Sequence, residues 1–142
     1  MQREIINNIN IINGKIEELC TSVKRDKNEI TLIAVSKKKS HELIEIALNN
    51  GIENFGENYA QELKEKSFLI NSEKIIWHFI GPIQSNKVKI IANHADWIHS
   101  LEREKIIKKL DTECKKINKT INACLQVNIS CLLYTSDAAD DA

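Results

Sequence analysis

The stretch LIAVSKKKS, residues 32–40, indicates what kind of fold this chain adopts. Its first four residues, with Ile30 and Thr31 before them, form an apolar, β-branched segment that is typical of a parallel strand buried on both faces. The segment ends at Ser36 and three consecutive lysines, of which Lys37 is the first. We therefore predict a buried strand with a lysine at its carboxyl end.

Short apolar segments alternate with helical patterns along the rest of the chain. Further strands are predicted at residues 52–58, 74–83, 96–101 and 120–130. The connecting segments carry apolar residues in steps of three and four, and Ser40 and Ser85 are predicted to cap two of the helices. The remaining predicted helices include Tyr59–Phe68 and Ile106–Ile117. Alternation of this kind indicates an α/β fold with parallel strands and helical crossovers.

The N-terminal segment is predicted to form an amphipathic helix that precedes the first strand. Its apolar stripe consists of Ile5, Ile9, Ile12, Ile16, Leu19 and Val23. This helix should cover the edge or the bottom of the sheet.

Two architectures fit this order of elements. One is an open, doubly wound sheet of about five strands, and the other is the first part of a (β/α)8 barrel, which typically needs about 250 residues. The pattern alone favours the complete open sheet. A receiver-type version is disfavoured because Lys37 stands where acidic residues would be needed. In both architectures the chemistry belongs at the carboxyl ends of the strands, where Lys37, Asn58, His78 and Ser100 are expected.

Composition excludes several classes of partner. The 142 residues suffice for one domain, and the 20 basic and 20 acidic residues balance, so charge predicts neither nucleic acid nor a membrane surface as partner. The chain has no signal-peptide pattern and no apolar run long enough to span a bilayer, so we expect a cytoplasmic protein.

Metal and nucleotide sites are also not predicted. The four cysteines are scattered, which favours reduced thiols, and the four histidines lack metal-ligand spacing. The chain contains neither a G-x-G-x-x-G motif nor a P-loop.

Lys37 is the strongest candidate for a reactive side chain. A partly dry site at a strand end disfavours the ammonium form, and the free amine is the form that attacks the aldehyde of a carbonyl substrate or of pyridoxal phosphate. Position alone favours a solvated lysine in a turn. Position alone likewise favours Asn58 as an ordinary turn residue and His78 as a core histidine with its hydrogen bonds satisfied.

Four motifs in order carry a specific resemblance. LIAVSK, ENFGENYAQEL, WHFIGPIQSNK and QVNIS closely resemble segments of the YggS/PROSC family of pyridoxal phosphate homeostasis proteins, over residues 5–130. The resemblance implies a (β/α)8 barrel similar to the N-terminal domain of alanine racemase (fold type III), preceded by a helix. This chain would then contain the first five βα units of an incomplete barrel.

The resemblance also implies a cofactor and its site. Lys37 would hold pyridoxal 5′-phosphate as an internal aldimine, Asn58 and His78 would line the cofactor mouth, and Val35 and Ser36 would lie beneath the ring. The implied function is a carrier in vitamin B6 and amino-acid homeostasis without catalytic turnover, monomeric at full length and with pyridoxal-phosphate-dependent apoenzymes as possible partners. The alternative is a racemase-like enzyme that uses Lys37 as its base.

Residues 131–142, CLLYTSDAADDA, break the alternation of strands and helices. One interpretation is a disordered acidic terminus, and the other is a non-native tail translated from a sequencing adapter. On the second interpretation this chain follows the natural sequence only to about residue 130, and it is cut off before the loops that bind phosphate in such barrels. We would then expect this polypeptide to be poorly soluble or free of cofactor.

Overall fold

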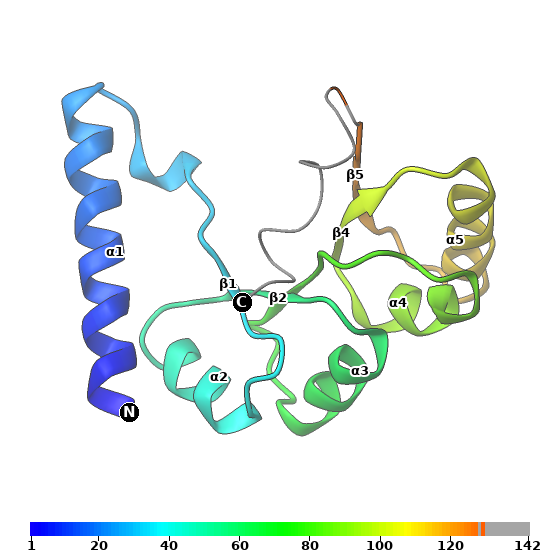
Figure 1. Ribbon diagram of the computed structural model, residues 1–142, viewed down its shortest axis with the longest axis horizontal. Helices are drawn as coiled ribbons and strands as arrows, with labels where there is room; N and C mark the ends of the chain where they lie inside the picture. The colour runs from blue at the N-terminus through cyan, green and yellow to red at the C-terminus, as the bar shows by residue number, and fades with distance from the viewer. Residues whose placement is uncertain (128, 130–142) are drawn as a thin grey trace.

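A computed structural model describes residues 1–127 and 129 of the chain (Figure 1). The strands are β1 (Ile33–Val35), β2 (Asn54–Glu57), β3 (Ile76–Phe79), β4 (Trp97–Leu101) and β5 (Asn122–Leu125). The helices are α1 (Gln2–Ser22), α2 (His41–Leu48), α3 (Ala60–Leu69), α4 (Val88–His94) and α5 (Glu104–Lys116), with the 3-10 turns η1 (Lys27–Glu29) and η2 (Ser85–Lys87). Strands and helices alternate from β1 onward, as predicted.

The sheet has the strand order β1-β2-β3-β4-β5, and every neighbouring pair is parallel. The register aligns Val35 with Gly56, Gly56 with His78, and His78 with Trp97. An open doubly wound sheet reverses its strand order part-way. The preference for the open sheet is therefore wrong, because each strand here is added on the same side of the previous one. Figure 1 shows α2 to α5 following the outer side of the resulting arc.

The hydrophobic core lies between the helices and the outer face of the sheet. The strands contribute Phe55, Phe79 and Ile98, which are at most 2% exposed. The helices contribute Ile44, Leu63, Val88 and Ile91, which are equally buried and pack in the same cluster. Burial of these side chains holds each helix against the strand before it.

The inner face of the sheet is much less covered. Gly56 lies there, because it follows Phe55, whose side chain is in the core on the outer face. A Cβ atom at Gly56 would be 3.1 Å from Ile80 Cδ1 and 3.3 Å from Ile33 Cγ2. Val35 lies two residues after Ile33 on the same face and is 49% exposed. The prediction that this first strand is buried on both faces is therefore wrong, since Ile33 and Ala34 are only partly buried and Val35 is exposed.

Helix α1 forms where it was predicted and contacts α2 and η1. Only part of its apolar stripe is used: Ile9 is buried, whereas Leu19 and Val23 are 66% and 69% exposed. The helix packs against α2, the helix that follows the edge strand β1, and contributes Ile9 to the core.

One of the two predicted helix caps is observed. Ser40 is the N-cap residue of α2, although its hydroxyl makes no capping hydrogen bond and instead hydrogen-bonds the Glu42 side chain, which lowers the pKa of that carboxyl. Ser85 lies inside η2, and α4 begins only at Val88.

Strand β5 ends at Leu125, so the prediction of strand at residues 126 and 127 is wrong. Residues 128 and 130 of the predicted strand and the suspected tail at 131–142 lie outside the described residues.

None of the helices within the described residues has the length and apolar character needed to cross a membrane.

Candidate functional site

Lys37 and Asn58 lie at neighbouring positions on the carboxyl edge of the sheet. Lys37 follows β1 by two residues, and Asn58 directly follows β2. The ladder continues to this edge, since Ser36 N donates to Gly56 O at 2.9 Å and Ile80 N donates to Glu57 O at 2.9 Å. Parallel strands in this register bring together the two residues that the sequence singled out.

The three lysines after β1 are not equivalent. Lys37 is partly buried, whereas Lys38 and Lys39 are exposed. The chain turns here, with Lys39 N donating to Ser36 O at 3.0 Å and Lys38 in the left-handed region at φ 58°. Ser36 points toward the helices, and Lys37 follows it as the first residue of the turn.

Ser36 and Val35 lie on opposite faces. Ser36 is buried on the helix side, where its hydroxyl donates to Glu57 Oε1 at 2.6 Å, and Val35 lies on the inner face. Their predicted place beneath a cofactor ring stays a prediction.

Asn58 is held by a close approach of two backbone segments. It is 8% exposed, and a Cβ atom at Gly81 would lie 2.2 Å from the Asn58 carbonyl oxygen. Only glycine therefore fits at position 81, and the segment after β3 packs directly against the segment after β2. Ser100 lies within β4, and its hydroxyl donates to the Gly81 carbonyl, which extends this contact to a third strand.

His78 is part of a hydrogen-bonded chain across the inner face. Its Nε2 lies 2.8 Å from Asn54 Oδ1 and its Nδ1 lies 2.9 Å from His99 Nε2, while the Trp97 ring stacks on it at 5.9 Å between centroids. With Asn54 Oδ1 as the acceptor, Nε2 carries the proton of His78, and Nδ1 accepts from His99. Both ring nitrogens are thus used.

The electrostatics of this chain favour neutral rings. Burial, with a smaller effect of His99, lowers the pKa of His78 to about 4, and burial also lowers the pKa of His99. His78 is in register with Val35, so it lies two residues deeper than the edge formed by Lys37 and Asn58. It has the partners of a core histidine, and its predicted contact with a cofactor stays a prediction.

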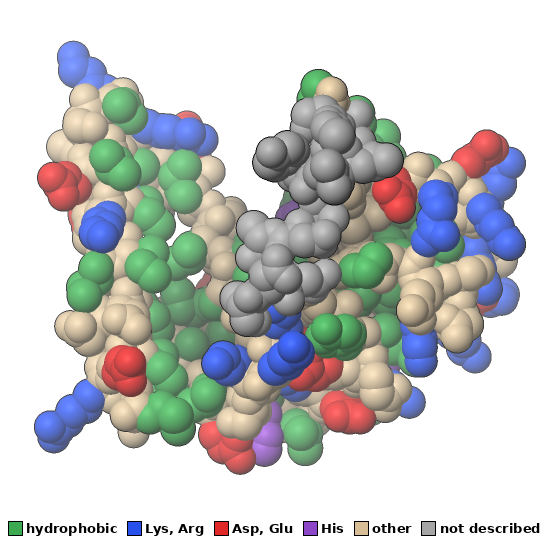
Figure 2. Space-filling model, in the orientation of Figure 1, with side chains coloured by type: hydrophobic (Ala, Val, Ile, Leu, Met, Phe, Trp, Pro, Cys, Tyr) green, Lys and Arg blue, Asp and Glu red, His purple; other side chains and the backbone are tan. Residues whose placement is uncertain are grey.

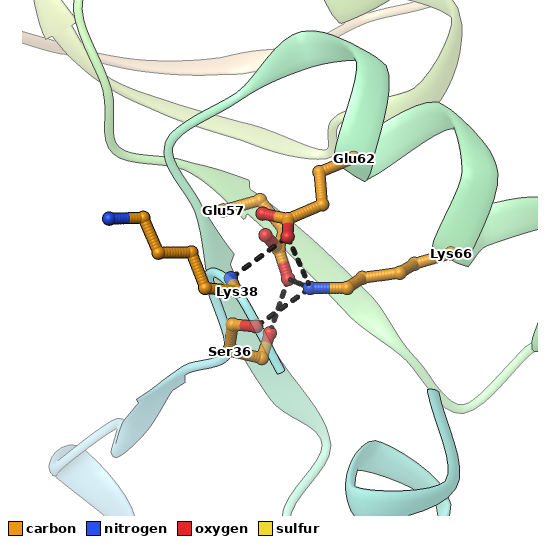
Figure 3. Close-up of polar contacts among 5 residues, drawn as sticks. All are labelled: Ser36, Lys38, Glu57, Glu62 and Lys66. Carbon is orange, nitrogen blue, oxygen red and sulfur yellow. Dashed lines mark hydrogen bonds and ion pairs between the residues drawn. The ribbon is translucent and has the colours of Figure 1, made fainter. Parts of the chain in front are cut away.

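A buried polar cluster supports the edge from the helix side (Figure 3). Lys66 Nζ, on α3, donates to Ser36 O at 2.7 Å and to Glu57 Oε1 at 2.8 Å. Glu62 Oε1, one turn earlier, accepts from Lys38 N at 2.8 Å and lies 3.6 Å from Lys66 Nζ. Lys66 and Glu57 are 5% and 0% exposed.

Burial raises the pKa of Glu57 to about 7, and its hydrogen bonds with Lys66 and Ser36 offset this only in part. Sequence reasoning missed Glu57, Glu62, Lys66 and His99. For two of them a signal was available: Glu57 alternates with Phe55 on the core-facing side of its strand, and Lys66 follows Leu63 by three residues in the buried stripe of α3. A charged residue at an apolar position of both elements indicates a buried pair.

Comparison with known proteins finds related sequences. The chain is 42% identical over 128 residues to the pyridoxal phosphate homeostasis protein of Haemophilus influenzae, which covers 89% of this chain and 54% of the relative. The corresponding protein of Escherichia coli is 38% identical over 130 residues, with 89% and 56% covered. The chain is thus similar to pyridoxal phosphate homeostasis proteins along nearly all of its own described length. It spans about half the length of these relatives, and no family model matches it.

Solved structures show the same similarity. PipY of Synechococcus elongatus, solved without pyridoxal phosphate, matches with a TM-score of 0.73 and 30% identity over 85% of this chain and 57% of PipY. PipY with pyridoxal phosphate bound matches with a TM-score of 0.70 and 33% identity over 81% and 55%. A protein of Bifidobacterium adolescentis shares the fold, with a TM-score of 0.83 at 24% identity over 95% and 59%. The sequential parallel sheet is accordingly part of a (β/α)8 barrel.

Proposed function

We propose that this protein binds pyridoxal 5′-phosphate at the carboxyl edge of its sheet, with Lys37 as the attachment residue. The observation that carries the proposal is the position of Lys37, which is partly buried just beyond a strand end, next to the buried Asn58. The bound pyridoxal phosphate of the related PipY supports it.

The residues present fit this cofactor. When bound, pyridoxal phosphate supplies an aldehyde carbon with which a lysine amine condenses reversibly, releasing one water. Lys37 provides the amine, Asn58 provides a buried amide beside it, and Val35 provides an apolar floor one step deeper. The neutral His78 and His99 add no charge below this floor. The predicted phosphate-binding loops beyond residue 130 lie outside the described residues.

We further propose that the protein is a carrier rather than a racemase. Racemisation needs a second acid/base opposite the attachment lysine. His78 was the candidate for this role, but its ring nitrogens are engaged by Asn54 and His99 and it lies deeper than Lys37. A cytoplasmic, monomeric carrier that delivers its cofactor to pyridoxal-phosphate-dependent apoenzymes is the finer form of the proposal.

Trapping with borohydride tests the attachment. The protein expressed from its complete gene is mixed with pyridoxal phosphate, reduced so that the carbon–nitrogen double bond becomes a stable amine, and mapped by peptide mass spectrometry. We expect the label on Lys37, its loss in Lys37→Arg, and its retention in the matched control Lys119→Arg. Label at another site, or no label, contradicts the proposal.

Hydrogen exchange at the substrate α-carbon separates carrier from enzyme. The same protein is incubated with amino acids in deuterated water, and incorporation of deuterium is followed by mass spectrometry. The carrier proposal predicts no exchange above a protein-free control. Exchange that disappears in Lys37→Ala would establish the racemase-like alternative instead.

A further inference from the structure

Three consecutive lysines end the first strand, and the structure distinguishes the first from the others by its backbone contacts. The carbonyl before Lys37, that of Ser36, accepts a hydrogen bond from Lys66 Nζ at 2.7 Å. The amide after it, that of Lys38, donates to Glu62 Oε1 at 2.8 Å. Both peptide groups that flank Lys37 are therefore held by side chains of α3.

These two side chains form one unit. Glu62 and Lys66 lie one helical turn apart, with Glu62 Oε1 3.6 Å from Lys66 Nζ. Lys66 is also paired at 2.8 Å with Glu57, which is fully buried in β2. The pair is thus fixed to the sheet as well as to its own helix, and it resists movement of the turn.

The turn between them needs such support. Lys38 has φ 58°, a left-handed conformation that is unfavourable for a residue with a Cβ atom. Figure 3 shows the Lys38 side chain extending away from Glu62 and Lys66, while its amide points to Glu62. Holding the amide in this way keeps the second lysine turned out of the cluster.

We propose that Glu62 and Lys66 are positioning residues that select Lys37, rather than Lys38 or Lys39, as the lysine that reacts with pyridoxal phosphate. This proposal rests on the proposed function and adds the contacts that select the attachment lysine. With both flanking peptides fixed, the Cα–Cβ bond of Lys37 is held in one direction. Without them the turn relaxes, and three chemically identical amines compete.

Two methionine variants remove the contacts, and two further variants serve as controls. Lys66→Met removes the ammonium that binds Ser36 O, and Glu62→Met removes the acceptor for Lys38 N. Glu62→Gln is the conservative variant, because its amide oxygen still accepts from Lys38. Leu63→Ala lies on the same helix, destabilises the packing of a fully buried residue, and leaves both contacts in place.

The first readout is the distribution of the borohydride label among Lys37, Lys38 and Lys39 in the protein expressed from its complete gene. We expect Lys37 to dominate in the wild type, in Glu62→Gln and in Leu63→Ala. In both methionine variants the ratio of label on Lys37 to label on the other two should fall roughly ten- to hundred-fold, the usual effect of misplacing a reacting group by about 1 Å.

The second readout needs no cofactor. Hydrogen exchange at the Lys38 amide should be slow in the wild type and in Glu62→Gln, and roughly tenfold faster in Glu62→Met, since a hydrogen bond of about 1.4 kcal/mol corresponds to a factor of ten.

Retention of the label on Lys37 in both methionine variants would overturn the inference while leaving the proposed function intact. Absence of label from all three lysines of the wild type would overturn the proposed function, and the selection of Lys37 with it.

Discussion

The two faces of the sheet are built on different principles. The outer face is covered by helices over the three central strands, where Phe55, Phe79 and Ile98 are almost completely buried. The inner face carries the hydrogen-bonded chain of Asn54, His78 and His99 and leaves Val35 half-exposed. Figure 2 shows apolar side chains open to view between α1 and the rest of the molecule.

The difference shows how the protein separates stability from chemistry. Its buried ionisable side chains, Glu57 and Lys66, lie on the outer face, where they hydrogen-bond each other and Lys66 fixes the backbone at Ser36. The inner face presents neutral histidines and the amine of Lys37 at its edge. On the proposed function, the reactive amine is held by a scaffold that is stabilised from the helix side.

The largest expected contrast is between two truncations on neighbouring strands. Phe55→Ala should lower the free energy of unfolding by about 3–5 kcal/mol, because it leaves a cavity in the sealed core. Val35→Ala should cost about 0.5 kcal/mol or less, because that side chain is 49% exposed. Urea unfolding of the 142-residue chain measures both. Equal losses would mean that the inner face is as well packed as the outer one.

A smaller effect is expected from the pH dependence of the outer face. Folded Glu57 keeps its proton up to its raised pKa of about 7, whereas the unfolded chain releases it near 4.5. The folded state therefore binds more protons in this window, and stability falls as pH rises through it, by on the order of 3 kcal/mol. Glu57→Gln should abolish this fall in urea unfolding at about pH 5 and about pH 8. Substitution of the exposed Glu65, as Glu65→Gln, should leave the fall in stability unchanged. A Glu57→Gln variant that shows the same pH dependence as the wild type would contradict the raised pKa of Glu57.

The inner face should show the opposite sign, with the smallest effect. Folded His78 has a pKa lowered to about 4, against 6.5 for the ordinary side chain. The unfolded state binds more protons between these values, so stability falls as pH drops below about 6.5, by about 2 kcal/mol at about pH 5. His78→Gln should remove this loss of stability at low pH and should not change the pH dependence that comes from Glu57. An NMR titration that finds the His78 ring protonated at about pH 5.5 would refute the prediction.

The sequence was sufficient for the order of elements and for the position of Lys37, because both depend on local patterns of apolar residues and on where a strand stops. It could not establish the strand order, since periodicity within a segment does not say which strands are neighbours. The His78–His99 contact depends on the register of β3 against β4, and the contact of Lys66 with Glu57 depends on how α3 packs on β2. These are relations between elements.

The sequential strand order has a consequence for how the chain folds. Register partners such as Val35 and Gly56, or Gly56 and His78, are separated by about twenty residues of sequence. Contact order is consequently low for a parallel sheet, and low contact order favours fast folding. Each strand pairs with the strand that precedes it in the sequence, which has already been synthesised when the next βα unit leaves the ribosome. The sheet can therefore grow during synthesis from β1 toward β5.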